Sequence, residues 1–391
     1  MPLSGDELQR YARHLALPGV GRDGQERLRR ASVLVIGLGG LGSPAALYLA
    51  AAGIGRLGLV DHDDVALHNL QRQILHDTPA VGGAKTDSAR ERLEALNPHV
   101  QLDTWHLALT RDNARGIIAD YDVVVDGTDS FATRYLVNDA CVLEQKPLIQ
   151  ASVHRFEGQL SVYATADGPC YRCLHPEPPP AGSVPNCAEG GVLGVLPGLL
   201  GVLQAVEALK LVLEIGEPLA GRLLVVDALT MRFESVVVAR DQDCAWCATN
   251  ERTELLDDYA AFCGELPLAV AAADAPATGR PSAGDAPREI SPSALAERLA
   301  RGDRVLVLDV REEWEVRVAS LDGARLVPMA RIPAERPTLP ADREIAVLCH
   351  HGTRSAMVAE YLRASGHARA MNVSGGIDRW SVEVDPSVPR Y

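Results

Sequence analysis

A glycine-rich turn between a short apolar run and an apolar helix constrains this chain more than any other feature. The run Ser32–Ile36 leads directly into Gly37-Leu38-Gly39-Gly40-Leu41-Gly42, and Pro44–Ala52 has helical character. In such a strand–turn–helix unit the backbone can approach a phosphate, and the N–H groups of the helix start face the anion. Each glycine can also serve tight packing of the helix on the strand. The turn predicts an α/β fold with a nucleotide site.

The same rhythm continues through the N-terminal part of the chain. Strands and helices alternate as expected for βαβ units, which form a mostly parallel, doubly wound sheet. We expect strands at Arg56–Asp61, Asp122–Asp126 and Pro147–Ala151, a helix at Lys85–Leu96, and hairpin strands within Gln159–Thr165 and Arg222–Arg240.

An Ala-, Pro- and Gly-rich segment at residues 264–287 has the composition of an extended linker. We therefore expect two domains in the 391 residues, one at 1–263 and a smaller α/β domain at 288–391. The smaller domain should contain a helix that starts at Ser291-Pro292, strands at Val305–Asp309 and Ile345–Leu348, and a helix at Ser355–Ser365.

Bulk properties exclude several classes of protein. The formal net charge is -14, whereas binding along a nucleic-acid backbone needs a basic face, so we expect no direct nucleic-acid partner. Residues 1–17 are polar and lack the apolar centre of a signal peptide. Glycine, proline and charged residues interrupt the longest apolar stretch, Val192–Leu213, which therefore predicts a buried helix and not a membrane span. We expect a cytoplasmic protein with no membrane contact.

Charged residues beyond the strands indicate which nucleotide the turn would bind. Asp61 lies where an acidic residue takes ribose hydroxyls, which by itself fits NAD. Arg72 and Lys85 have no use in hydride transfer, but they would neutralise a triphosphate. Asp129, in Asp126-Gly127-Thr128-Asp129-Ser130, follows another strand and can hold a divalent metal beside the phosphates. Together these residues favour ATP with Mg²⁺.

Several segments together resemble the MoeB/ThiF family, over roughly residues 8–250. They are Arg10-Tyr11-Ala12-Arg13, VLVIGLGGLGSPAALYLAAAGIG, VDHDDVALHNLQRQILH, VGGAKTDSA, DGTDSFATRYLVNDAC and CYRCLHPEPP. Members of this family adenylate the C-terminal glycine of ubiquitin-like sulfur carriers. The resemblance implies a Rossmann-like sheet, a homodimer, and a ubiquitin-like sulfur carrier protein ending in Gly-Gly as the partner.

The resemblance also implies roles for individual residues. Asp129 would be the essential acidic residue near Mg²⁺, and Arg13 would reach the ATP of the partner subunit. Many members carry Asn where this chain has Ser130, so a carboxamide contact is changed there. Asp129, Arg72, Lys85 and Arg13 are the expected catalytic residues of this domain. The expected ATP contacts are Gly37, Gly39, Gly40, Asp61, Asp63, Asn69, Arg72, Lys85, Asp129 and Ser130.

Two Cys-x-x-Cys pairs, Cys170/Cys173 and Cys244/Cys247, lie far apart in the sequence. Four thiolates without a nearby histidine match a closed, structural, tetrahedral Zn²⁺ site. The wide gap implies that the metal joins two distant segments. Two redox-active pairs are the alternative, but neither pair has the strand-to-helix setting of thioredoxin. A disulfide framework of the 8 cysteines is disfavoured in a long chain without an export signal.

A further cysteine, Cys349, opens the loop Cys349-His350-His351-Gly352-Thr353-Arg354-Ser355 between a predicted strand and helix. Backbone N–H groups, the helix dipole and Arg354 would stabilise a thiolate or persulfide there. An inert, buried cysteine is the alternative. With LDVREEWE and VSGGIDRW, the loop makes residues 288–391 resemble a rhodanese domain. The resemblance implies that Cys349 carries sulfur. We expect His350 and His351 to be loop positions, neither ligands nor bases.

These features predict an adenylyltransferase fused to a sulfurtransferase that receives sulfur from a cysteine desulfurase or thiosulfate. Molybdopterin synthesis is the expected pathway, with tRNA thiolation, thiamine synthesis or cysteine synthesis as alternatives. Cys187, in a polar glycine-rich loop, is expected to be a second catalytic thiol that links to the carrier or releases it.

Two rival functions use the same fold. A non-catalytic scaffold for a ubiquitin-like partner is disfavoured because Arg72, Lys85 and Asp129 are all present. A tRNA-modifying dehydratase is disfavoured by the cysteine pairs and by the rhodanese-like extension.

Overall fold

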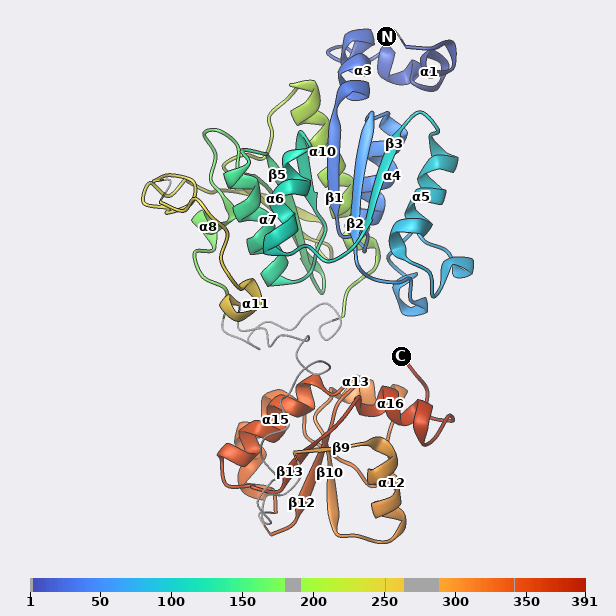
Figure 1. The fold of residues 1–391 in the computed structure, drawn as a ribbon, viewed down its shortest axis with the longest axis vertical. Helices are drawn as coiled ribbons and strands as arrows, with labels where there is room; N and C mark the ends of the chain where they lie inside the picture. Colours follow the sequence, from blue (N-terminus) through green and yellow to red (C-terminus); the bar gives the residue numbers. More distant parts are fainter. Residues whose placement is uncertain (1–2, 180–190, 250, 264–287, 341) are drawn as a thin grey trace. The chain divides into compact units, whose positions relative to one another are not determined.

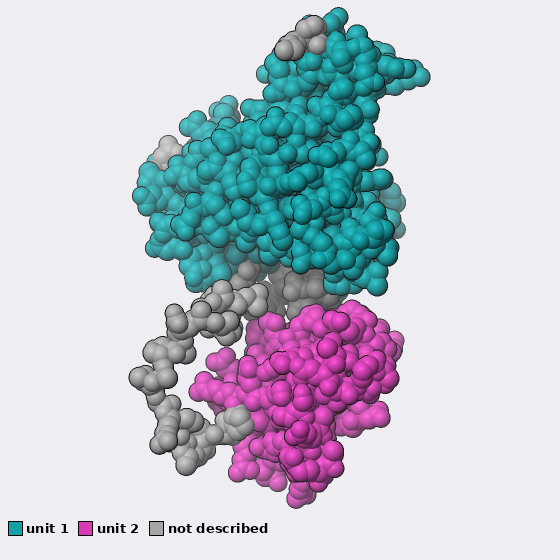
Figure 2. All heavy atoms as spheres, turned by 45° about the vertical axis from the view of Figure 1, so that its right-hand side comes forward, with its two compact units in different colours: residues 1–273 teal, residues 274–391 magenta. Residues whose placement is uncertain are grey.

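The structure is a computed structural model that describes residues 3–179, 191–249, 251–263, 288–340 and 342–391 (Figure 1). The chain divides into two compact units, Met1–Ala273 and Asp274–Tyr391 (Figure 2). The predicted linker at residues 264–287 lies outside the described residues, so the predicted domain boundaries stay predictions.

Within the described residues, the first unit is built on an 8-stranded sheet of order β3-β2-β1-β4-β5-β6-β7-β8. Strands β1 to β5 pair in parallel, whereas β6, β7 and β8 each pair antiparallel with the preceding strand. This confirms the predicted mostly parallel α/β sheet with hairpin strands added to it. The strands are β1 (Ser32–Ile36), β2 (Arg56–Asp61), β3 (Gln101–His106), β4 (Val123–Asp126), β5 (Leu148–His154), β6 (Glu157–Tyr163), β7 (Arg222–Asp227) and β8 (Arg232–Val237).

Helices cover both faces of this sheet (Figure 1). The described helices of this unit are α1 (Gly5–Arg10), α2 (Ala12–Leu15), α3 (Gly21–Arg30), α4 (Gly42–Ala52), α5 (Lys85–Leu96), α6 (Arg111–Ala119), α7 (Phe131–Leu143), α8 (Tyr171–Leu174), α10 (Val195–Leu213) and α11 (Tyr259–Phe262). Because side chains alternate along a strand, Val33 and Val35 of β1 join the core under α4 and α10, while Leu34 and Ile36 join the core under α6 and α7. A strand that is buried on both faces has a continuously apolar sequence, and β1 has such a sequence.

Helix α10 accounts for most of the long apolar stretch. By length and composition alone it could cross a membrane, but Leu196, Leu200 and Ala208 belong to the core that it forms with the sheet. Helix α10 packs closely on α4 because Gly201 has no side chain: a Cβ there would lie 2.1 Å from the carbonyl oxygen of Leu41. Burial within the first unit therefore explains part of the apolar character of this segment, while Val195 and Val206 remain exposed.

The second unit is a smaller α/β domain with a parallel sheet of order β11-β10-β12-β13-β9. As predicted, a helix starts after Ser291, whose hydroxyl accepts the N–H of Ala294 at 3.2 Å. Its elements are β9 (Glu289–Ile290), α12 (Pro292–Ala300), β10 (Val305–Asp309), α13 (Glu313–Val318), β11 (Arg325–Leu326), α14 (Ile332–Glu335), β12 (Glu344–Leu348), α15 (Thr353–Ala364), β13 (Ala370–Val373) and α16 (Gly376–Glu383).

One predicted helix start in this unit is wrong. Helix α15 begins at Thr353 and not at Ser355. Gly352 takes a left-handed conformation with φ 98°, which glycine adopts without strain, and this turns the loop into the helix earlier.

Substitution of two glycines in α10 tests the close packing of this helix. Gly201→Ala is expected to lower the free energy of unfolding by about 1–3 kcal/mol, because the new methyl group meets the backbone at Leu41. The matched control is Gly198→Ala on the same helix, where a Cβ would meet nothing within 4 Å. The control should raise the free energy of unfolding by about 0.5–1 kcal/mol. Urea unfolding followed by circular dichroism measures both, and equal effects would contradict this account of the packing.

Candidate active site and metal centre

A cavity of about 490 Å³ opens where the parallel strands of the first unit end. Every residue that the sequence predicts to contact ATP lines it, from Gly37 after β1 to Ser130 after β4. These residues lie together because parallel strands carry their carboxyl ends to one edge of the sheet, where such folds bind ligands. The cavity is of a size that holds small molecules.

The glycine turn is shaped by backbone contacts that leave no room for side chains. Gly37 has φ 82°, and its N–H donates to the carbonyl of Val60 at 2.8 Å. A Cβ on Gly42 would lie 1.8 Å from the Gly37 carbonyl oxygen. Asp61 Oδ2 accepts the N–H of Leu38 at 2.7 Å, so this buried carboxylate holds the turn in place.

Two cationic side chains are held on the wall of the cavity. Lys85 Nζ donates to Asp63 Oδ2 at 2.7 Å and lies 3.9 Å from Asp61 Oδ2. Burial alone would raise the pKa of Asp63, but its hydrogen bond with Lys85 and the ammonium charge hold that pKa below its usual value. Arg72 Nη2 donates to Asn69 Oδ1 at 3.2 Å. Two oriented cations beside a glycine turn can neutralise a polyphosphate.

The loop after β4 presents a carboxylate to the same cavity. Asp126 is fully buried and accepts the N–H of Thr128 at 2.9 Å and Nε2 of Gln150 at 3.0 Å. These bonds orient the loop, and Asp129 lines the cavity with its side chain exposed. Ser130 caps α7, since its Oγ accepts the N–H of Thr133 at 3.3 Å. Serine therefore meets the capping requirement at this position without the carboxamide of Asn.

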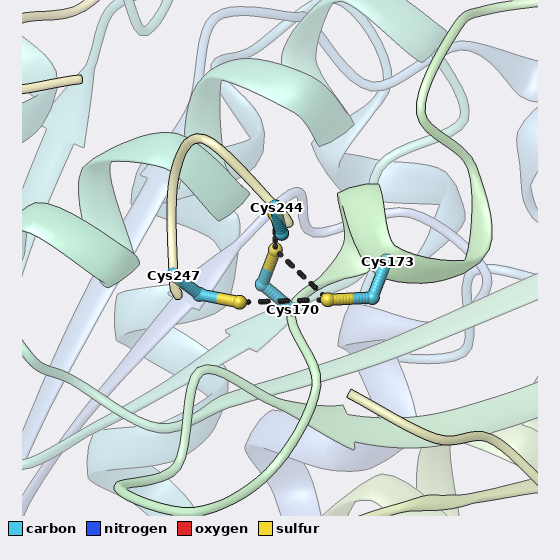
Figure 3. A group of neighbouring side chains, drawn as sticks. All are labelled: Cys170, Cys173, Cys244 and Cys247. Atoms are coloured by element: carbon cyan, nitrogen blue, oxygen red, sulfur yellow. Dashed lines mark hydrogen bonds between the residues drawn. The ribbon is translucent and has the colours of Figure 1, made fainter. Parts of the chain in front are cut away.

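The four paired cysteines converge from segments far apart in the sequence, after β6 and after β8 (Figure 3). All are free thiols, and their sulfur atoms lie within 4.8 Å of one another. The separation between Sγ atoms is 3.9 Å for Cys170–Cys173, 3.7 Å for Cys170–Cys244 and 3.4 Å for Cys173–Cys247. A tetrahedron of thiolates around zinc has edges of about 3.8 Å, given Zn–S bonds of about 2.3 Å. The donor set therefore fits a metal such as zinc.

A buried ion pair joins this cluster to helix α7. Arg172, between two of the cysteines, donates Nε and Nη2 to Asp139 of α7 at 2.7 and 2.8 Å. The same carboxylate accepts the hydroxyl of Tyr259 at 2.8 Å. The guanidinium also stacks on the ring of Trp246 at 4.9 Å, next to the second cysteine pair. The position of the cluster is thus set by contacts beyond the thiols themselves.

Cys349 follows β12 in the second unit and is 1 % exposed. Its Sγ accepts the N–H of Gly352 at 3.1 Å, and Ser355 Oγ lies 3.1 Å from the sulfur. The predicted backbone donor to the sulfur is therefore present. Arg354 behaves differently from the expectation, because it directs its guanidinium to Glu315 of α13, at 2.8 and 2.7 Å. This cation fixes the loop through a distant carboxylate.

The sequence matches the ThiF family over residues 11–246 and the rhodanese-like domain over residues 291–383. This chain belongs to the ThiF family. The fold is also similar to that of a solved structure with low sequence identity. The crystal structure of E. coli MccB with MccA-N7isoASN superposes with a TM-score of 0.56 at 23% identity, covering 61% of this chain and 75% of that one. This similarity shows the fold.

Relatives of this ThiF-family chain share its full length. It is 43% identical over 395 residues to "Probable adenylyltransferase/sulfurtransferase MoeZ" of Mycobacterium tuberculosis, covering 100% of this chain and 96% of that one. It is 42% identical over 403 residues to "Adenylyltransferase and sulfurtransferase MOCS3" of Anopheles gambiae, covering 100% and 90%. The chain is therefore an enzyme that combines an adenylyltransferase with a sulfurtransferase.

Two predicted catalytic residues lie outside the arrangement described above. Arg13 is exposed on α2 and does not line the cavity of its own chain, so its role across a subunit boundary stays a prediction. Cys187 lies outside the described residues, and its role likewise stays a prediction.

Sequence reasoning missed part of the cavity wall. Arg134 lines the cavity and donates to the carbonyl of Thr128 at 3.0 Å, directly beside Asp129. Its position one helical turn after Ser130 is a signal that would have found it, because residues four apart share a helix face. The loop 107–109 after β3 supplies apolar wall. Its place after a parallel strand is the corresponding signal.

Of the two histidines beside Cys349, His350 is half-buried and His351 is exposed. The His350 ring stacks on His351 at 3.9 Å and on Tyr391 at 4.2 Å, the latter with an interplanar angle of 5°. Burial, and then the charge of His351, lower the pKa of His350 to about 4. An unfolded chain has a histidine pKa of about 6.5. Between these values the unfolded chain binds more protons than the folded chain, so stability falls as the pH falls through this window.

His350→Gln is expected to flatten the fall in melting temperature of the second unit between about pH 6.5 and pH 4.5. His351→Gln removes only the neighbouring charge and should flatten it less. Differential scanning calorimetry across this range measures the slopes. A slope in His350→Gln equal to that of the unchanged protein would show that His350 does not titrate as its packing requires.

Proposed function

We propose that this enzyme adenylates the C-terminal glycine of a ubiquitin-like sulfur carrier protein ending in Gly-Gly. It then replaces the adenylate with sulfur carried as a persulfide on Cys349. The observation that carries the proposal is the presence in one chain of a cavity lined by oriented cations and of a thiol held by a backbone N–H group. The names of its full-length relatives contain both activities.

In the first step, the carrier's terminal carboxylate attacks the α-phosphorus of ATP. A P–O bond forms, and the bond to pyrophosphate breaks. Backbone N–H groups of the glycine turn would bind phosphate oxygens, while Arg72 and Lys85 would stabilise the charge that develops on them. Asp129 is the oxygen ligand that we propose for Mg²⁺, which when bound supplies further positive charge at the phosphates. The product is a mixed anhydride that a weak nucleophile can attack.

In the second step, Cys349 receives sulfur from a donor such as thiosulfate or a cysteine desulfurase. The outer sulfur of the persulfide attacks the acyl carbon, the bond to AMP breaks, and an acyl disulfide on Cys349 remains. A second thiol, for which we propose Cys187, attacks the Cys349 sulfur. The carrier leaves as a thiocarboxylate, and a disulfide forms between the two cysteines. An external thiol reduces this disulfide and resets the enzyme.

The four-cysteine cluster is proposed to hold Zn²⁺ in a structural role. All four positions are occupied by cysteine, so no site is open for water or substrate. Binding there would tie the segment after β6 to the segment after β8. The redox alternative is not supported by the mutual separations of the sulfur atoms, which suit four ligands of one ion.

We propose that the enzyme acts as a homodimer. A shallow apolar groove beside α4 and α10 is lined by Tyr48 and Val206, which are 55% and 43% exposed. Arg13 precedes His14, which also lines the groove. Pairing of two copies through this face would bring Arg13 of one subunit toward the cavity of the other. Each cavity would then receive a cation that its own chain does not supply.

Molybdopterin synthesis is the pathway that we propose, in the cytoplasm and without direct contact with nucleic acid. The acidic net charge of -14 supports the last point. The same chemistry would equally serve tRNA thiolation, thiamine synthesis or cysteine synthesis, since each consumes a carrier thiocarboxylate.

Single substitutions are expected to affect adenylation and sulfur transfer separately. Asp129→Asn is expected to lower carrier-dependent ATP–pyrophosphate exchange by about 100-fold, because the loss of a carboxylate ligand would weaken the binding of Mg²⁺ beside the phosphates. Cys349→Ala should leave exchange unchanged but abolish the conversion of the carrier to a thiocarboxylate, followed by intact mass with thiosulfate as donor. Asp120→Asn, exposed and away from the cavity lining, is the matched control. Thiocarboxylate formation by Cys349→Ala would refute the proposed role of this thiol.

Metal analysis tests the cysteine cluster. The purified chain is expected to hold about one zinc ion, and Cys173→Ser or Cys247→Ser should lose it and melt at lower temperature. Cys141→Ala, which changes a buried thiol outside the cluster, should retain the metal. Mass-spectrometric metal content and calorimetry provide the two readouts. Full metal content in both cluster variants would mean that these thiols are not the ligands.

A further inference from the structure

Tyr391 contacts the sulfur-bearing loop of the second unit from a position far along the chain. Its ring lies on His350 at 4.2 Å, the residue that follows the proposed sulfur carrier. The ring also contacts the ring of Trp314, with centroids 6.0 Å apart and planes at 74°, and the guanidinium of Arg311 at 5.9 Å. The aromatic ring therefore sits between the loop and the α13 region.

The hydroxyl of Tyr391 joins two buried charged groups. It accepts Nη1 of Arg311 at 2.7 Å and donates to Oε1 of Glu315 at 3.1 Å. Glu315 is the carboxylate that holds Arg354 at the far end of the loop. Arg311 is fully buried, and its remaining partners are Asp309 and the carbonyl of Ala319. One side chain thus touches both the beginning and the end of the loop, the first by stacking and the second through Glu315.

Arg390 reinforces this contact from the neighbouring position. It donates Nε and Nη2 to Asp378 of α16 at 2.7 and 3.1 Å. The N–H of Asp378 donates in turn to the carbonyl of His350 at 3.1 Å. The pair Arg390–Asp378 is exposed on the Arg390 side and contributes little alone, but it places Tyr391 against the loop.

We propose that Tyr391 is a positioning residue for sulfur transfer, which holds the Cys349 loop so that the Gly352 N–H points at the sulfur. This inference rests on the proposed role of Cys349 as the sulfur carrier. The loop has to accommodate one additional sulfur atom and release it again, so its shape must be held by groups that do not react. Stacking on His350 and the Glu315 bridge to Arg354 supply that restraint without contact with the sulfur.

A purely structural role is the competing explanation, since any buried tyrosine stabilises a domain. The two explanations differ in what the remaining folded protein does. A structural role predicts a lower melting temperature with unchanged chemistry below it. A positioning role predicts that folded variants transfer sulfur more slowly and that their Cys349 thiol responds differently to pH.

The test compares Tyr391→Phe and Tyr391→Ala in the full chain, below the melting temperature of each variant. Sulfur transfer from thiosulfate to cyanide should fall about tenfold in kcat in Tyr391→Ala, because a misplaced nucleophile reacts more slowly. Tyr391→Phe keeps the ring on His350 but loses the hydroxyl contacts, and its rate should fall less, by about two- to fivefold. The pH profile of Cys349 alkylation by iodoacetamide, resolved by peptide mass spectrometry, should move to higher pH in Tyr391→Ala.

A control substitution and two milder variants distinguish failure of this inference from failure of the proposed function. Tyr361→Ala, on α15 of the same unit and 40% exposed, should change neither the rate nor the profile. If Tyr391→Ala does not fold, Tyr391→Phe and Arg390→Gln carry the test, with a loss of about two- to fivefold expected in each. Unchanged rates and profiles in the folded Tyr391 variants would overturn this inference. Activity of Cys349→Ala in the same assay would instead overturn the proposed function.

Discussion

The cavity of the first unit depends on one buried carboxylate, that of Asp61. It accepts the N–H of Leu38 at 2.7 Å and the N–H of Asp63 at 2.9 Å, so it shapes the loops after β1 and after β2 together. Burial of a carboxylate is costly unless donors surround it, and these backbone groups, with Lys85 nearby, meet that requirement. Asp126 repeats the device after β4 with Thr128 and Gln150. The cavity is therefore organised by the protein itself before any ligand enters.

Local sequence pattern was sufficient where apolar runs are short and sharply bounded. Strands β1 and β2 and helix α5 have the predicted limits, because glycine turns and polar residues end each run. The shared position of the predicted ATP contacts also followed from sequence. Once the strands are parallel, residues placed after them have to meet at one edge of the sheet. The proximity of the two cysteine pairs could be predicted for a different reason, because four thiolates are a typical ligand set of one zinc ion.

Partner choice between distant side chains could not be predicted in this way. Arg354 was expected to act on the sulfur, but it binds Glu315, which lies 39 positions earlier in the sequence. Tyr391 gave no local signal, because its importance comes from the rings and charges that tertiary folding brings around it. Arg134 carried a usable signal in its helical spacing from Ser130, but only the packed structure shows that it borders the cavity. Which distant side chains become hydrogen-bond partners depends on the tertiary structure, and the hydrophobic periodicity of the sequence does not contain this information.

The order of residues in the second unit has a consequence for its biosynthesis. Strand β9, which begins at Glu289, pairs with the much later strand β13. The buried Arg311 donates a hydrogen bond to the hydroxyl of Tyr391, which is made later still. All of the described strands of the first unit have been made once β8 is complete, so this sheet can form while translation continues. The sulfur-bearing unit cannot complete its buried charge network until residue 391 has left the ribosome. A nascent chain thus acquires the unit that contains the cavity before it acquires an ordered Cys349 loop.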